Sequence, residues 1–199
     1  MRLIGTVVIS VLVFLFMNSI IPTMSEAEIY SSTIRLHVLA NSDSEQDQML
    51  KLKVRDALLE EIAEYDAQSK AEALLKMEEN KDNLIKIAED VLEKEGCDRE
   101  VSIEIGSESY PTRYYEDFAL PAGKYTSVRV LIGEGEGQNW WCVLYPPLCT
   151  SVAVELDEEY IDVGLTKDQY NLITQANSEY KIKFKLLEMA SQVFGFNYD

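Results

Sequence analysis

The chain has 199 residues, 47% of them hydrophobic, and a formal net charge of −17 at pH 7. It is long enough to bury a real core, but its acidity excludes binding to nucleic acid through phosphate neutralisation and adsorption to an anionic membrane surface. Three cysteines are too few for a scaffold built from disulfides, and with one histidine they form no convincing metal-ligand set, so we expect no metal and no other cofactor.

The amino terminus has the composition of an export signal. Arg2 precedes an apolar run over residues 3–17, and Ser25 and Ala27 are the small residues that a signal peptidase reads. The run is shorter than the roughly 20 apolar residues of a spanning helix, although an uncleaved anchor over residues 3–21 is the alternative. We therefore predict a signal peptide, or an N-terminal membrane anchor, over residues 1–27 and a single exported domain over residues 28–199.

A strand followed by a turn is predicted first in that domain. Ile34 and Leu36 alternate with Arg35 and His37, which is typical of a half-buried strand with one polar face. The polar turn after the strand contains Ser42, which with Glu45 fits a capping box at the start of a helix.

Helices are predicted next, and the chain then changes to β-structure. Apolar residues recur at helical spacing over residues 50–62 and again over residues 70–95, where Gly96 is placed to end the second helix in the left-handed conformation. Alternating strands follow, among them residues 125–132 and the strand that holds both tryptophans, and the three glycines between them predict a flexible hairpin loop. A final helix is predicted to begin at Ser178. This order predicts an α+β fold: one domain, a mostly antiparallel sheet, two helices in the N-terminal half and a C-terminal helix.

The cysteines and the single histidine allow one catalytic hypothesis. His37 with Cys142, Cys149 or Cys97 would make the nucleophile and base of an exported Cys-His hydrolase or transpeptidase that acts on cell-wall peptides. No characteristic segment surrounds these cysteines, and a thiol between Trp141 and Val143 is more typical of an inert buried residue. Cys142 and Cys149 flank two prolines, so either a disulfide between them or two buried thiols fits the spacing.

The motifs resemble the stage II sporulation protein R family of endospore-forming bacteria. The resemblance rests on IRLHVLANSDS (residues 34–44) and NWWCVLYPPLC (139–149), and it extends to residues 47–48, 50–56, 120–125, 129–130, 132–135 and 182–185 with Glu188.

The resemblance implies a signalling protein that is exported into the space between the forespore and mother-cell membranes. There it would activate a membrane-embedded aspartic protease, at its extracytoplasmic face, which processes a pro-sigma factor of the mother cell. It would be an activator without catalysis of its own.

The partner-binding surface is predicted from residue chemistry. Trp, Tyr and Arg dominate binding hot spots, and the strand and turn around Arg35 are more polar than a core strand requires. The candidates are Arg35, His37, Asn41, Ser42, Trp140 and Trp141, with one of the adjacent indoles directed inward because neighbouring strand residues face opposite sides. Substitution of Arg35 or His37 is then expected to abolish activation and leave the thermal midpoint nearly unchanged.

Overall fold

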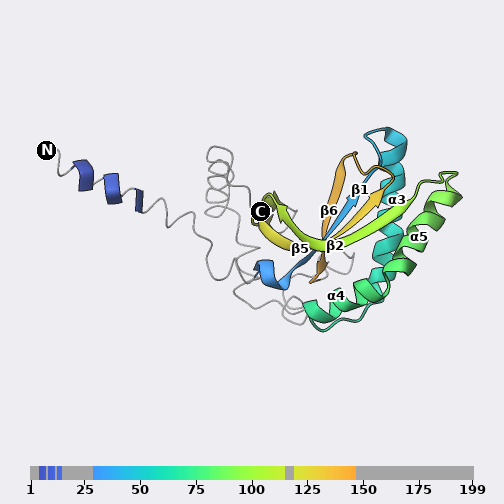
Figure 1. Ribbon diagram of the computed structural model, residues 1–199, viewed down its shortest axis with the longest axis horizontal. Helices are drawn as coiled ribbons and strands as arrows, with labels where there is room; N and C mark the ends of the chain where they lie inside the picture. Colours follow the sequence, from blue (N-terminus) through green and yellow to red (C-terminus); the bar gives the residue numbers. More distant parts are fainter. Residues whose placement is uncertain (1–4, 8, 12, 15–28, 115–118, 147–199) are drawn as a thin grey trace. The chain divides into compact units, whose positions relative to one another are not determined.

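The computed structural model describes residues 5–7, 9–11, 13–14, 29–114 and 119–146 (Figure 1). Described residues 31–108 and 125–146 belong to one compact unit, and the remaining described residues belong to a second. The main elements are β1 (Ile34–Leu39), α3 (Glu45–Ala63), α4 (Lys70–Glu79), α5 (Lys81–Lys94), β2 (Val101–Tyr110), β5 (Gly123–Ile132) and β6 (Asn139–Tyr145).

The sheet is mixed, and its strand order is β2-β5-β1-β6. β1 runs parallel to β5 and antiparallel to β6. The Gly133 amide, just after β5, donates to the Glu100 carbonyl just before β2, so these two strands run antiparallel. The predicted α+β class with a mostly antiparallel sheet is confirmed.

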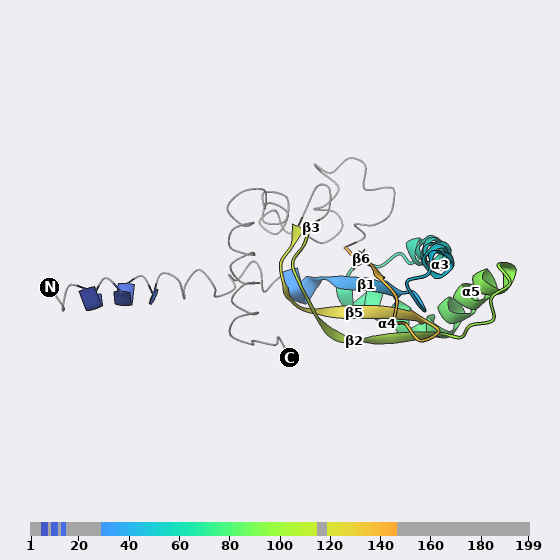
Figure 2. The same cartoon turned by 90° about the horizontal axis from the view of Figure 1, so that it is seen from above.

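The helices cover one face of this sheet (Figures 1 and 2). Ile34, Leu36 and Val38 of β1 point into a core that also receives Leu50, Val54 and Leu58 of α3. The α3 side chains recur every four residues and the β1 side chains every two, as the sequence periodicities predict. The core therefore lies between β1, its neighbours in the sheet, and the inner stripe of each helix.

The amino end of α3 differs from the predicted capping box. Ser44 is the N-cap, and its hydroxyl accepts a hydrogen bond from the Asp47 amide at 3.2 Å. The Ser42 hydroxyl instead donates to the Asp47 carboxylate at 2.6 Å. The prediction that Ser42 caps this helix is wrong, because Ser44 lies at the correct spacing for the third helical amide.

The predicted helix over residues 70–95 is two helices, α4 and α5, so the described part of the N-terminal half has three long helices instead of two. Asn80 ends α4 and begins α5, with φ −100° and ψ 8°, outside the regular helical region. Gly96 has a φ of 74° and ends α5 as predicted. The Cys97 amide donates to the Leu92 carbonyl and the Gly96 amide donates to the Glu93 carbonyl, which is a Schellman motif.

The second unit contains a short antiparallel pair, β3 (Arg113–Tyr114) with β4 (Ala119–Leu120). The Tyr30 hydroxyl donates to the Ala122 carbonyl at 3.1 Å, and a Cβ at Gly123 would approach the Tyr30 ring to 2.6 Å. Glycine is therefore required at this position by the close approach of the tyrosine.

Two predictions concern the ends of the chain, which the structure describes only in part. Within the described residues, no helix is both long and apolar enough to cross a membrane. The helix expected to begin at Ser178 lies outside the described residues.

Candidate functional site

The face of the sheet opposite the helices carries a cluster of polar and aromatic side chains. His37, in the centre of β1, lies opposite Arg129 of β5 and Trp141 of β6. Arg35 lies opposite Ser127 and Val143 in the same two strands. The alternation of β1 thus brings three of the predicted partner-binding residues, Arg35, His37 and Trp141, to one face of the sheet.

His37 is held between an indole and a carboxylate. Its ring stacks on Trp141 with 3.9 Å between centroids and 17° between planes, and its Nδ1 lies 3.4 Å from Glu108 Oε2. The Ser127 hydroxyl donates to the same Glu108 oxygen at 3.0 Å. Burial lowers the pKa of His37 below 6.5, although the Glu108 carboxylate opposes that shift, so the ring is neutral at pH 7.

Arg129 forms the accessible margin of this cluster. Its Nη1 donates to Glu104 Oε2 at 3.0 Å, its Nε lies 3.6 Å from Glu108 Oε1, and its side chain is one-third exposed. Glu104 and Glu108 come from β2 and are not among the residues predicted from the sequence. Only the antiparallel pairing of β2 with β5 places these two carboxylates beside Arg129. That pairing could be predicted only if the order of the strands in the sheet were known.

Arg35 and His37 are interior residues. Arg35 is 0% exposed and His37 is 3% exposed, and the Arg35 guanidinium carbon lies 5.1 Å from the centroid of the Tyr125 ring. The prediction that β1 is half-buried with an exposed polar face is wrong, because both faces of this central strand are covered. Substitution of either residue must therefore disturb packing, contrary to the expectation of an unchanged thermal midpoint.

Asn41 and Ser42 belong to a different cluster, in the turn between β1 and α3. Both donate to the Asp47 carboxylate, at 3.1 Å and 2.6 Å, and the Arg99 guanidinium pairs with its other oxygen. Burial alone would raise the pKa of Asp47, but the bonds from Ser42 and Asn41 and the charge of Arg99 lower it to about 2. Asn41 and Ser42 therefore organise the turn around a buried carboxylate.

The glycine-rich loop between β5 and β6 is fixed against this turn. The Glu134 amide donates to Asn41 Oδ1 at 3.1 Å, and the Gly137 amide donates to the Ala40 carbonyl at 2.8 Å. A Cβ at Gly137 would collide with the Ser42 carbonyl. The loop links β5 to β6, but β1 lies between these two strands in the sheet, so the prediction of a hairpin is wrong. The loop's glycines permit its close approach to the turn.

Replacing Gly137 with alanine should lower the free energy of unfolding by about 1 to 3 kcal/mol, because the new methyl group must displace backbone atoms. Urea unfolding followed by circular dichroism measures the change. Gly106→Ala is the matched control, since a Cβ there meets nothing within 4 Å. Equal stability of the two variants would show that the loop does not need its close contact with the turn.

Trp140 lies on the helix side of the sheet. It is partly buried against the core, and the Arg55 guanidinium carbon of α3 lies 4.8 Å from the centroid of its ring. Trp141 faces the His37 side. The prediction that the two adjacent indoles point to opposite faces is confirmed, and Trp140 is the inward one.

The geometry excludes a catalytic pair of Cys142 with His37. Cys142 lies opposite Leu36 in the register of β1 and β6, so it points into the helix-side core while His37 points to the other face. Cys142 is also disulfide-bonded, whereas Cys97 is a free thiol. Cys149 lies outside the described residues, so its pairing with Cys142 stays a prediction. Among the described residues, no three His, Cys, Asp or Glu side chains are placed to hold a metal ion.

Comparison with known proteins decides the family. The family model for stage II sporulation protein R matches residues 30–155. The chain belongs to this family. It is 37% identical over 157 residues to stage II sporulation protein R of Bacillus subtilis (strain 168), across 72% of this chain and 70% of that protein. No solved structure matches the chain. Membership supports a role in sporulation.

Proposed function

We propose that this member of the stage II sporulation protein R family is an exported signal of endospore formation. It acts in the space between the forespore and mother-cell membranes and activates a membrane-embedded aspartic protease that processes a pro-sigma factor. It performs no catalysis itself. The observation that carries this proposal is the family resemblance of two segments. Residues 34–44 form β1 and the turn after it, and residues 139–149 include β6 with both tryptophans.

The β1–β6 face supplies a contact surface for such a partner. Trp141 is half-buried, Arg129 is one-third exposed, and Glu104 is 59% exposed, so an indole, a guanidinium and a carboxylate are accessible together. Arg35 and His37 lie buried beneath this surface, and the His37 ring stacks on Trp141. Activation requires only that the surface binds the active form of the protease more tightly than the inactive form.

The acidic charge and the amino terminus support the proposed location. A net charge of −17 keeps the exported protein away from anionic membrane surfaces. Removal of residues 1–27 would leave a freely diffusing domain that begins near residue 28. The mass of the exported protein tests this point. If residues 1–21 were retained in a membrane fraction, the protein would be anchored and would not diffuse freely.

Reconstitution tests the proposal directly. The candidate protease in lipid vesicles is mixed with its pro-sigma substrate, and purified residues 28–199 are added on the extracytoplasmic side. We expect processing to depend on the added protein, with no cleavage of substrate by that protein alone. Processing that is independent of the protein, or cleavage without the protease, would contradict activation.

A further inference from the structure

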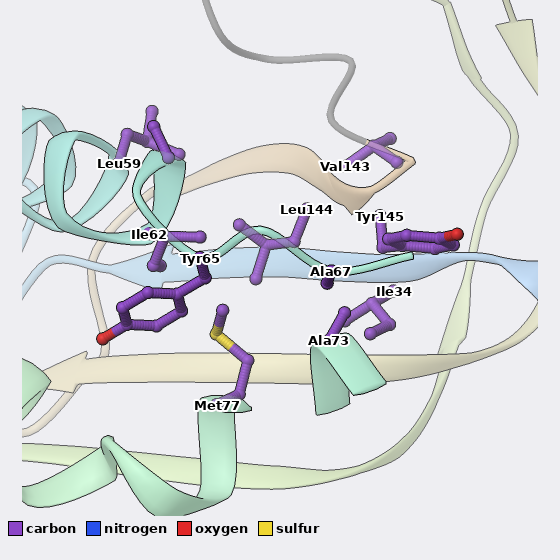
Figure 3. Close-up of a pocket in the computed structure, with 11 residues that line it drawn as sticks. Ile34, Leu59, Ile62, Tyr65, Ala67, Ala73, Met77, Val143, Leu144 and Tyr145 are labelled. Atoms are coloured by element: carbon purple, nitrogen blue, oxygen red, sulfur yellow. The ribbon is translucent and has the colours of Figure 1, made fainter. Parts of the chain in front are cut away.

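A second accessible feature is an apolar cavity on the helix side of the sheet. It has a volume of about 100 Å³ and lies between the end of α3, the segment before α4, α4 itself and β6 (Figure 3). Its walls include Leu59, Ile62, Met77, Leu144 and Tyr145. An engineered apolar cavity of about 150 Å³ binds benzene, so a cavity of this class suits a small apolar group.

The segment that forms most of the lining of this cavity is acidic. The segment over residues 59–79 provides seven of the eleven lining residues and carries seven carboxylates against two lysines. The Tyr65 hydroxyl donates to Glu61 Oε1 at 3.4 Å, and burial together with that carboxylate raises the pKa of Tyr65 to about 12. Burial, with the Glu72 charge, also raises the pKa of Tyr145. The Glu61 and Glu72 carboxylates therefore act on two tyrosines of the cavity wall.

Charge complementarity selects the occupant. An apolar floor inside a negative rim favours an apolar side chain whose neighbours in sequence are lysine or arginine, and it disfavours an acidic segment. One of the two lysines of this segment is already paired. Lys76 is engaged with Glu72 at 3.1 Å and with the Asp66 carbonyl.

We propose that this cavity receives an apolar side chain from a basic extracytoplasmic segment of the partner, and this inference rests on the proposed function. The cavity and the Trp141 surface lie on opposite faces of β6, which presents Leu144 to one and Trp141 to the other. The partner thus contacts the sheet edge from both sides. A basic flank on the partner also explains why an activator would carry so much negative charge near this opening.

A peptide experiment tests the chemistry of the cavity. Protein labelled with ¹³C at methionine methyl groups is titrated with the blocked peptide Lys-Lys-Leu-Lys-Lys. The Met77 methyl in the wall should shift saturably, while the Met49 methyl, 55% exposed on α3, should not. Replacing the leucine by alanine, or the lysines by glutamate, should weaken binding by about tenfold or more. Equal shifts with all three peptides, or no shift of Met77, would overturn the inference.

Two variants test whether the cavity contributes to activation of the protease. Ala67→Leu fills the cavity from its rim, and Ala71→Leu adds the same atoms at an exposed position of α4 outside it. In the reconstituted assay we expect Ala67→Leu to activate about tenfold less at limiting concentration and Ala71→Leu to match wild type. Equal activation by both, with wild-type protein active, overturns the cavity proposal alone, whereas inactive wild-type protein overturns the proposed function.

Reversing the charge of an exposed residue tests the proposal without altering the packing of the cavity. Glu64→Lys changes an exposed residue between the lining residues Ala63 and Tyr65, and Glu93→Lys makes the same change on exposed α5. Glu64→Lys should lower activation of the protease and make that activation less dependent on salt concentration. Glu93→Lys should change neither the activation nor its salt dependence. Sedimentation of wild-type protein alone completes the test, because a dimer that Ala67→Leu dissociates would identify a second copy as the occupant and overturn the proposal.

Discussion

Replacing Asp47 with alanine should lower the free energy of unfolding by about 3 to 5 kcal/mol, the largest loss of stability expected from any single change in the turn. The carboxylate is 4% exposed and accepts bonds from Ser42, Asn41 and Arg99. Its removal leaves these donors without their acceptor, and it also removes a negative charge from the first turn of α3.

The measurement is urea unfolding at pH 7, with Asp56→Ala as the control on the same helix. Asp56 pairs with Arg55 at the surface and is 64% exposed, so its removal should cost no more than about 1 kcal/mol. A loss for Asp47→Ala as small as that of the control would mean that Ser42 and Asn41 organise the turn without the carboxylate.

The same carboxylate predicts how stability depends on pH. Its pKa is about 2 in the folded protein against an ordinary 3.8, so its contribution is complete above pH 3.8 and is lost as the pH falls through 2. A difference of that size corresponds to about 2.5 kcal/mol. Asp47→Asn should therefore be less stable than wild type at pH 6 and approach it at pH 2. A constant difference between the two proteins over this range would contradict the assigned pKa.

The local pattern of the sequence predicted most elements correctly. Alternation in residues 34–39 and four-residue spacing in residues 50–58 identified β1 and α3, because one face of each is buried in the same core. The left-handed Gly96 was predicted because only local backbone geometry decides it. The break at Asn80 was missed, since the apolar stripe continues from Met77 to Leu84 across it.

The candidate site was less predictable, because its contacts join residues that are distant in sequence. Arg35 and His37 alternate with apolar residues in a way that indicates an exposed face, yet burial depends on what covers that face. Glu108 contacts His37 across 71 residues, and Arg99 contacts Asp47 across 52. Neither pair leaves a signal in the spacing of one sequence, so only the sheet order and the end of α5 bring them together.

Trp141→Ala should reduce activation of the protease by about thirtyfold or more, the loss of about 2 kcal/mol that is typical of a binding hot spot. The indole is half-buried on the face that also presents Arg129, so a partner can cover what remains exposed. Loss of its stacking on His37 should lower the free energy of unfolding by only about 1 kcal/mol.

The adjacent tryptophan provides the matched control. Trp140 packs against the helix-side core beneath Arg55, so Trp140→Ala should lower the free energy of unfolding by about 2 kcal/mol and leave activation by the folded fraction close to wild type. Comparing both variants at a temperature where each remains folded separates binding from stability. If the two losses were exchanged, with activation depending on Trp140 and stability on Trp141, the partner would bind along α3 and would not contact the Trp141 face.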